Sequence, residues 1–349
     1  MKNIIKILFV IIGTIVGAGF ASGKEIYLFF FVYGLKGIVG IIISSLIMSI
    51  TIYKVFKICS ENKIINYQDF CKYIGNEYIG NIVHIFLIIT FFIMISGFSS
   101  FLKQEFNINQ STGSILIILL CYITLRNNVK GVVKVSNYLM PLLIIFLVIT
   151  SLKNLDVINN YNNIFNYQLT PKYGGYFQSI LYGCYNCILL IPVVISLNNY
   201  IKNKKDILYS TIGSGFIILM LSICVYNLLL LGDIRIYNVE MPIIEIVKKY
   251  GSIYKNLYII IIGIAIYTTA VSTGYSFLNR WENNKKVYKR YLKVISVFAF
   301  FLSKISFSFL VNLLYPILGI VGVLEILLIM LSNTNNIKVL KYCNKKSIK

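Results

Sequence analysis

Charged and ionisable residues are scarce in this chain of 349 residues. Only 13% of the residues are charged, twelve are acidic and one is a histidine. Soluble domains contain about a quarter charged residues, so this composition excludes an ordinary soluble protein. The chain also lacks a metal-spaced cluster of histidine and cysteine, and paired carboxylates on a common face, which leaves acid–base and metal catalysis without their usual groups. We therefore do not expect an enzyme.

Apolar residues fill the chain instead: they make up 58% of it, and the mean hydropathy is +0.78. A helix that crosses a membrane needs about 20 apolar residues. Segments that approach or exceed this length lie at 4–31, 37–56, 82–101, 108–125, 132–152, 176–197, 208–231, 257–278, 291–305 and 309–331. The sequence therefore predicts an all-α polytopic membrane protein with ten transmembrane helices.

Basic residues outnumber acidic ones by 33 to twelve, which gives a formal net charge of +21. In a soluble chain this excess would suggest nucleic acid as the partner. Here the lysines and arginines concentrate in alternate polar gaps between the apolar segments, as the positive-inside rule requires. We expect a multi-pass protein of the bacterial cell (inner) membrane with both termini cytoplasmic, surrounded by the lipid bilayer and with no nucleic-acid partner.

Ten spans divide into two sets of five. Because five is odd, a second copy of the same unit enters the membrane from the other side, which makes an inverted repeat. The expected boundaries are 1–152 for the first repeat, 153–175 for an extracellular loop, 176–332 for the second repeat and 333–349 for a basic cytoplasmic tail.

The first segment is interrupted. Four glycines lie between residues 13 and 23, and Lys24 and Glu25 follow directly. Glycines at this spacing also allow close helix packing, and that reading stays open. A charge inside the bilayer is usually retained for a cavity, a partner or a pathway, so we expect a break at 17–23. Lys24 and Glu25 are candidate gating or coupling residues unless they lie at the outer interface.

The sixth segment carries a corresponding interruption, Tyr-Gly-Cys-Tyr-Asn at 182–186, followed by Pro192. Interrupted spans at matching positions in two halves indicate the binding site of a transporter. A broken helix exposes N–H groups to an anion and carbonyl groups to a cation. A zwitterion would suit both ends of such a break.

The string from Gly13 to Gly19 resembles the first-span motif of the neurotransmitter:sodium symporters and of the wider amino acid–polyamine–organocation superfamily. Continued to Glu25, it is similar to the YkvI family of bacterial membrane proteins, which are thought to be transporters of unknown substrate. The likeness to the YkvI family extends over the whole chain, whereas the likeness to the symporters is confined to short motifs.

The resemblance implies two sets of site residues. A sodium ion would be held by oxygen atoms of Gly13, Val16, Ala265, Thr268 and Thr269. The carboxylate of a solute would meet Ala18 and Gly19, with Gly183, Tyr185 and Asn186 opposite. Threonines in membrane helices also commonly bond back to their own helix, which is the alternative for Thr268 and Thr269.

Together these features favour an ion-coupled secondary transporter, a symporter of an amino acid or a similar small organic solute. It would need no cofactor beyond Na+ or H+ as the coupling ion. Sodium is favoured, although Lys24 would repel a bound cation. Glu325, isolated in the tenth span, is either a coupling residue or a buried structural carboxyl.

The alternative is a membrane sensor that binds the same solute without transporting it, as in spore-germination receptors, because the fold alone does not decide function. The many tyrosines are typical of anchors at the membrane interface. The oligomeric state stays open.

Overall fold

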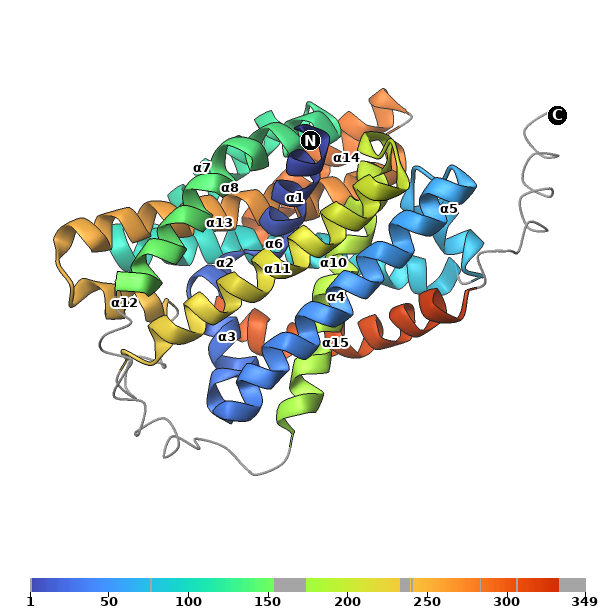
Figure 1. Cartoon of the computed structure of the whole chain (residues 1–349). Coiled ribbons are helices and arrows are strands. Elements are labelled where there is room, and N and C mark those ends of the chain that lie inside the picture. Colours follow the sequence, from blue (N-terminus) through green and yellow to red (C-terminus); the bar gives the residue numbers. More distant parts are fainter. Residues whose placement is uncertain are drawn as a thin grey trace, which may run out of the picture.

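The computed structural model describes residues 2–75, 77–153, 174–232, 239, 241–282, 284–305 and 307–332. Every regular element in these ranges is helical (Figure 1). The long helices are α4 (Leu35–Asn62), α6 (Glu77–Phe106), α7 (Gln110–Leu125), α8 (Asn128–Lys153), α10 (Gly175–Leu197), α11 (Lys204–Leu229), α13 (Ser252–Leu278), α14 (Lys285–Leu302) and α15 (Phe307–Leu331). Residues 154–173 of the expected loop and the expected tail at 333–349 lie outside the described residues.

The first apolar segment is divided into α1 (Lys2–Ile15), α2 (Ala18–Ala21) and α3 (Lys24–Phe29), followed by the 3₁₀ turn η1 (Phe31–Tyr33). Two short helices lie toward opposite ends of the bundle, α5 (Tyr67–Tyr73) and α12 (Pro242–Lys248). Further 3₁₀ turns are η3 (Asn198–Tyr200) and η5 (Asn279–Trp281). All ten apolar segments of the sequence fall on helices.

Seven of the described helices are long and apolar enough to cross a membrane, namely α4, α6, α8, α10, α11, α13 and α15. Helices α1 and α7 are apolar but shorter. Large apolar side chains such as Phe216 on α11 and Phe298 on α14 are exposed on the outside of the bundle. In water such surfaces would be unfavourable. The chain is therefore a multi-pass membrane protein.

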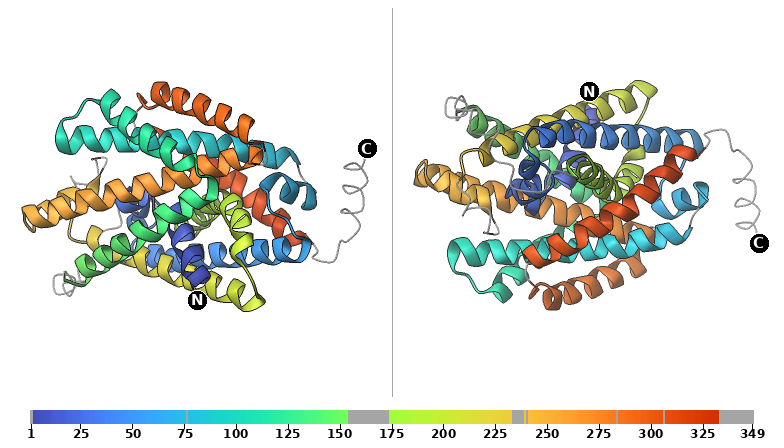
Figure 2. Two further views of the ribbon diagram at one scale, coloured as in Figure 1. Left: turned by 90° about the horizontal axis from the view of Figure 1, so that it is seen from above. Right: turned by 90° about the horizontal axis from the view of Figure 1, so that it is seen from below.

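Helix α10 runs through the middle of the bundle (Figure 2), and 94% of its apolar stretch is buried. Small residues allow its neighbours to approach closely. A Cβ atom on Gly40 of α4 would lie 2.0 Å from the hydroxyl of Ser179, and one on Gly322 of α15 would lie 2.3 Å from the carbonyl oxygen of Cys184. This is the small-residue packing that membrane helices use in the absence of a hydrophobic driving force.

The predicted break in the sixth segment is wrong, because α10 is one continuous helix from Gly175 to Leu197. Gly183 serves packing instead: a Cβ atom there would lie 3.2 Å from the Ser44 carbonyl oxygen and 3.3 Å from Cβ of Ile47. The Asn186 side chain donates back to the Tyr182 carbonyl at 3.0 Å, within the same helix. The glycine therefore marks a close contact with α4, not an unwound backbone.

Candidate functional site

The first segment is unwound at two places. Helix α1 ends at Ile15, and Gly17 has an extended backbone with φ −96° and ψ −164° before α2 begins. A second interruption follows at Gly23, where φ is +83°, a conformation that favours glycine. The break expected at 17–23 is thus present, and it lies inside the bundle because residues 10–26 are buried.

Neighbouring helices supply hydrogen bonds to the carbonyl groups that the break frees. The hydroxyl of Tyr258 on α13 donates to the Ala21 carbonyl at 2.6 Å. The backbone N–H of Ile243 on α12 donates to the Ser22 carbonyl at 3.1 Å. Non-helical backbone survives in a membrane only where protein or water satisfies it in this way, so α12 and α13 hold the break in place.

Two of the residues expected to bind sodium meet directly. The hydroxyl of Thr269 on α13 donates to the Gly13 carbonyl at 2.9 Å and approaches the Thr14 carbonyl at 3.4 Å. The carbonyl of Val16 lies at the break and accepts no backbone hydrogen bond from the described residues. The Gly13 and Thr14 carbonyls belong to α1, the Thr269 hydroxyl belongs to α13 and the Val16 carbonyl follows the end of α1; all four residues are buried.

The other two members of that set lie on α13 but interact with each other. The Thr268 hydroxyl donates to the carbonyl of Ala265 and to that of Ile264, both at 3.0 Å. This is the back-bonding pattern common for threonine in membrane helices. In this arrangement Thr269, and not Thr268, connects α13 to the break.

Among the expected solute-binding residues, Tyr185 is brought to the break and Gly183 is not. Tyr185 reaches from α10 to the Glu25 carboxylate, donating to Oε2 at 2.5 Å. That carboxylate lies directly against Gly19, since a Cβ atom on Gly19 would be 2.1 Å from Glu25 Oε1. Ala18, Gly19, Tyr185 and Asn186 are all buried, so a solute would reach them only after a conformational change.

Lys24 and Glu25 point to different partners, although they are neighbours in the chain. The Lys24 ammonium donates to the Val239 carbonyl at 3.3 Å, toward the segment that precedes α12. The Glu25 side chain turns to α10 and is 2% exposed. Neither residue lies at an exposed interface, because Lys24 is only 7% exposed.

Glu325 on α15 is fully buried and lies near α5. Its Oε1 accepts a hydrogen bond from the Tyr67 hydroxyl at 2.7 Å, while its Oε2 has no hydrogen-bond partner among the described residues. Tyr67 also lines a cavity of about 50 Å³, together with Cys71, His84 and Arg280. The carboxyl is thus separated by one tyrosine from a cavity at the α5 end of the bundle.

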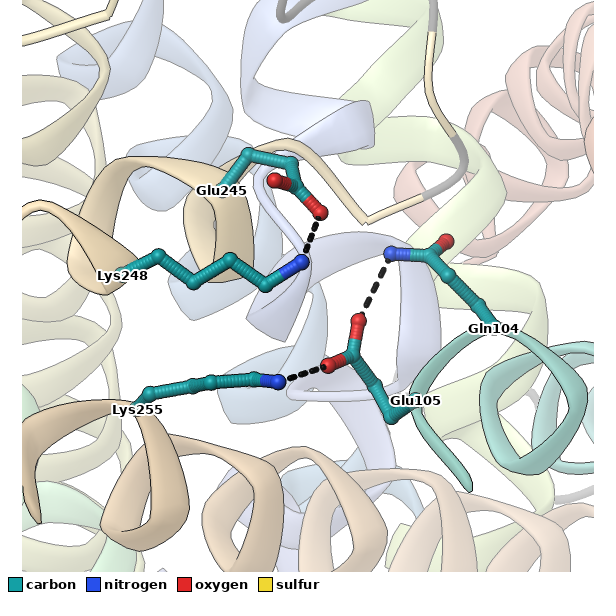
Figure 3. A network of polar contacts seen from close by, with 5 residues as sticks. All are labelled: Gln104, Glu105, Glu245, Lys248 and Lys255. Carbon is teal, nitrogen blue, oxygen red and sulfur yellow. Dashed lines mark hydrogen bonds and ion pairs between the residues drawn. The ribbon is translucent and has the colours of Figure 1, made fainter. Parts of the chain in front are cut away.

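Charged side chains cluster at the other end, beside α12 (Figure 3). Lys255 at the start of α13 forms an ion pair with Glu105 of α6 at 3.1 Å. Gln104 donates to the same carboxylate at 2.9 Å. Within α12, Lys248 pairs with Glu245 at 2.5 Å and both side chains are partly exposed. Of these contacts, the Lys255–Glu105 pair connects α6 to α13, beside the helix α12 that binds the Ser22 carbonyl.

Three tyrosines that the sequence reading treats as interface anchors lie in the core instead: Tyr182, Tyr258 and Tyr315 are each at most 1% exposed. The ring of Tyr185 stacks on that of Tyr315 with 4.6 Å between centroids. A hydroxyl inside an otherwise apolar span, as at 182, is the signal that would have found it, since buried tyrosines usually have a polar partner.

No family model matches the chain, but it is similar to individual known proteins. The uncharacterized membrane protein YkvI of Bacillus subtilis (strain 168) is 25% identical over 320 residues, which cover 90% of this chain and 91% of that protein. The chain resembles YkvI along nearly its whole length. The likeness expected from the first-span motif is confirmed.

Solved structures show the fold. A Na+-coupled sialic acid symporter in a substrate-bound, outward-open state matches with a TM-score of 0.69 and 14% identity, over 94% of this chain and 78% of that chain. MhsT in complex with L-phenylalanine matches with a TM-score of 0.62 and 14% identity, over 85% of this chain and 78% of that one. The chain shares the fold of these two proteins.

Proposed function

We propose that the chain is an ion-coupled secondary transporter, a symporter that moves an amino acid or a similar small organic solute across the bacterial cell membrane by alternating access. The observation that carries the proposal is the unwound backbone between α1 and α3 in the core of the bundle. Helix breaks of this kind provide the substrate and ion sites of secondary transporters.

The proposed architecture has ten spans arranged as two inverted repeats, 1–152 and 176–332, with both termini cytoplasmic. In this arrangement α1 to α3 form the first span, and α4, α6, α7, α8, α10, α11, α13, α14 and α15 form the rest. Five basic segments support this arrangement, because they lie at one end of the bundle (Figures 1 and 2). They are the start of α1 and the connections α4–α5, α7–α8, η3–α11 and η5–α14. Among the described residues, a broken span is found only in the first repeat.

A coupling sodium ion would be held by oxygens of Gly13, Val16, Ala265, Thr268 and Thr269. The meeting of the Thr269 hydroxyl with the carbonyls of Gly13 and Thr14 supports this location. Freed carbonyls beside hydroxyl groups suit a small, hard cation. A bound ion would connect α1 to α13 and so tie the position of the break to the ion gradient.

Binding of the solute is assigned to Ala18 and Gly19 of α2 with Tyr185 and Asn186 of α10, whereas Gly183 faces α4 and takes no part. Glu25 and Lys24 act as gating groups above it, and Glu325 is a second coupling candidate near α5. Proton coupling through the two buried carboxyls is the rival to sodium. This alternative is supported by the burial of Glu25 and Glu325, neither of which forms an ion pair with another described residue.

Uptake into proteoliposomes tests the proposal. Purified full-length protein is reconstituted, a sodium or a proton gradient is imposed, and accumulation of labelled amino acids and amines is measured. A symporter accumulates its solute above equilibrium only while the coupling gradient is present. A sensor binds the solute without uptake, and a passive channel gives flux that neither saturates nor depends on a gradient; either result would refute the proposal.

A further inference from the structure

A cavity of about 380 Å³ lies at the end of the bundle where α4 ends and α11 begins. This volume falls within the range of about 300–1,000 Å³ that is usual for small-molecule sites. The α4–α5 connection lines one side of the cavity and the η3–α11 connection lines the other. The Ser60 hydroxyl donates to Asn198 Oδ1 at 3.1 Å, and Asn198 Nδ2 donates to the Ile64 carbonyl at 3.4 Å. These two bonds hold the connections together, so the cavity is built into the fold.

Positive charge is concentrated in this cavity. Lys63, Lys202 and Lys204 line it, and all three side chains are exposed. No acidic side chain is among the described residues of the lining. The carboxylate of Asp206 accepts from the backbone N–H groups of Lys202 and Asn203 at 3.0 and 3.2 Å, and so caps α11 instead of pairing with a lysine. Three ammonium groups therefore share one cavity without an ion pair to a described residue.

Lys63 has an unusual backbone for a lysine. It ends α4 in the left-handed conformation, with φ +55° and ψ +36°. Glycine or asparagine normally takes this position after a helix, because a longer side chain is disfavoured there. The side chain at 63 nevertheless reaches the cavity that Lys202 and Lys204 line. An observed backbone outlier of this kind points to a function for the residue, and here the function is to place a third positive charge.

An exposed apolar stripe leads away from the cavity along α11. Leu208, Ile212 and Phe216 are all exposed, and their spacing of four residues places them on one face of the helix. The stripe begins one turn after Lys204 and extends for about 12 Å. The hydrocarbon part of one leaflet is about 15 Å thick, half of the membrane core. The stripe is therefore about as long as the part of an acyl chain that one leaflet contains.

Helix α4 runs beside α11 and adds to this surface (Figure 1). The two helices are in close contact, since a Cβ atom on Gly215 of α11 would lie 2.0 Å from the Ser49 hydroxyl of α4. Ile50 and Tyr53 of α4 are exposed as well. Apolar side chains of both helices thus face the surroundings of the bundle next to the basic cavity.

From this arrangement we propose that the cavity binds the headgroup of an anionic phospholipid, with its phosphate among Lys63, Lys202 and Lys204 and an acyl chain along the stripe of α11. Basic pockets between helices at the membrane surface bind anionic headgroups in this way. A soluble phosphate or an acidic peptide would meet the same lysines but would gain nothing from the stripe. The inference goes beyond the proposed function and does not depend on transport.

Lipid titration of the purified, delipidated full-length protein tests the inference. Native mass spectrometry counts the lipid molecules bound at each concentration of phosphatidylglycerol or phosphatidylcholine. Glycerol 3-phosphate, which has the phosphate without acyl chains, is the third probe. We expect one saturable site for phosphatidylglycerol and at least about tenfold weaker binding of phosphatidylcholine, because the choline cation cancels the attraction of the lysines. Equal affinity for phosphatidylcholine or for glycerol 3-phosphate would overturn the inference.

A triple variant locates the site. Lys63→Asn suits the left-handed backbone, and Lys202→Gln and Lys204→Gln leave the cap of α11 intact. Each lysine near the membrane surface contributes about fivefold to the binding of an anionic lipid, so the triple variant should bind phosphatidylglycerol about 100-fold more weakly. The matched control is Lys285→Gln, Lys286→Gln and Lys289→Gln. It removes the same charge from exposed positions of α14 at the same end of the bundle and should change the affinity by no more than about twofold.

Equal losses in the two triple variants would show that only the overall charge attracts the lipid, and would overturn the inference. Unchanged affinity in the cavity variant, or no saturable binding of phosphatidylglycerol to the original chain, would overturn it too. Thermal melting shows whether the cavity variant folds. If it does not, the single variant Lys204→Gln decides, with an expected loss of about fivefold.

Discussion

Two segments with similar sequence signals fold differently in this protein. The first segment, with its glycines at 13–23, is unwound between α1 and α3, whereas α10, with Gly183 and Pro192, stays continuous. In the first segment Glu25 folds back onto Gly19, and side chains and backbone of α12 and α13 bind the freed carbonyls. In α10 the glycine instead lets α4 come close. A glycine inside a membrane span therefore indicates a break only where other groups are present to satisfy the backbone.

The largest expected difference in uptake is between substitutions of two glycines, Gly19 and Gly183. Gly19→Ala places a methyl group 2.1 Å from Glu25 Oε1 and must displace this buried carboxylate. Displacing a binding group by about 1 Å can cost 100-fold, so uptake should fall by about that factor. Gly183→Ala meets its nearest neighbour at 3.2 Å and should retain most of the uptake. Equal losses in the proteoliposome assay would contradict the distinction between the two segments.

A second comparison concerns two buried tyrosines. Tyr258→Phe removes the donor to the Ala21 carbonyl and leaves this carbonyl unsatisfied, which should lower the free energy of unfolding by about 1–3 kcal/mol. Tyr182→Phe removes a hydroxyl without a hydrogen-bond partner among the described residues and should change stability by less than about 0.5 kcal/mol. Thermal melting of both variants without solute measures the difference. A larger loss for Tyr182→Phe would show that the break is not held by α13.

The two neighbouring threonines of α13 should differ by a smaller amount. Thr269→Val removes the bond to the Gly13 carbonyl, and interhelical hydrogen bonds in membranes average about 0.6 kcal/mol with a maximum of about 1.7. Thr268→Val removes only bonds within α13 and should be close to neutral in sodium-free buffer. If both are sodium ligands, the stabilisation by added sodium should fall in both variants. Full sodium stabilisation in both would refute the proposed ion site.

The smallest effect is expected at the partly exposed ion pair of α12. Glu245→Gln breaks the ion pair with Lys248 on α12, whose side chains are 30% and 37% exposed. Exposed pairs contribute about 0–1 kcal/mol, so melting and uptake should barely change. A marked loss of uptake would instead give this pair a role in gating, beside the buried contact of Ile243 with the break.

The sequence predicts the first break well because its signal is local. Glycines relieve the helix, and the adjacent charges of Lys24 and Glu25 disfavour a helix surrounded by lipid. It does not predict which of Thr268 and Thr269 faces α1. Consecutive residues on a helix point about 100° apart, and the rotation of α13 is set by packing against α6 and α8.

The cluster of tyrosines around Glu25 is only partly marked in the sequence, which singles out Glu25 and Tyr185 but not Tyr182 or Tyr315. Its members come from α3, α10 and α15, and Tyr315 is nearly 300 positions away from Glu25. Tyr182 and Tyr315 are read as interface anchors because the amphipathic rings of tyrosines favour that location. Only the packing of α15 against α10, through Gly319 and Gly322, turns Tyr315 into the core.

Hydropathy and charge spacing alone determined that this is a multi-pass helical membrane protein with an interrupted first segment, since burying apolar surface and exposing lysines are properties of each segment by itself. Whether a glycine opens a helix or brings two helices together was decided only by the neighbouring chain. The same holds for the direction of the Glu25 carboxylate. Both depend on which donors and acceptors the folded bundle places within hydrogen-bonding distance, and a linear sequence does not contain those distances.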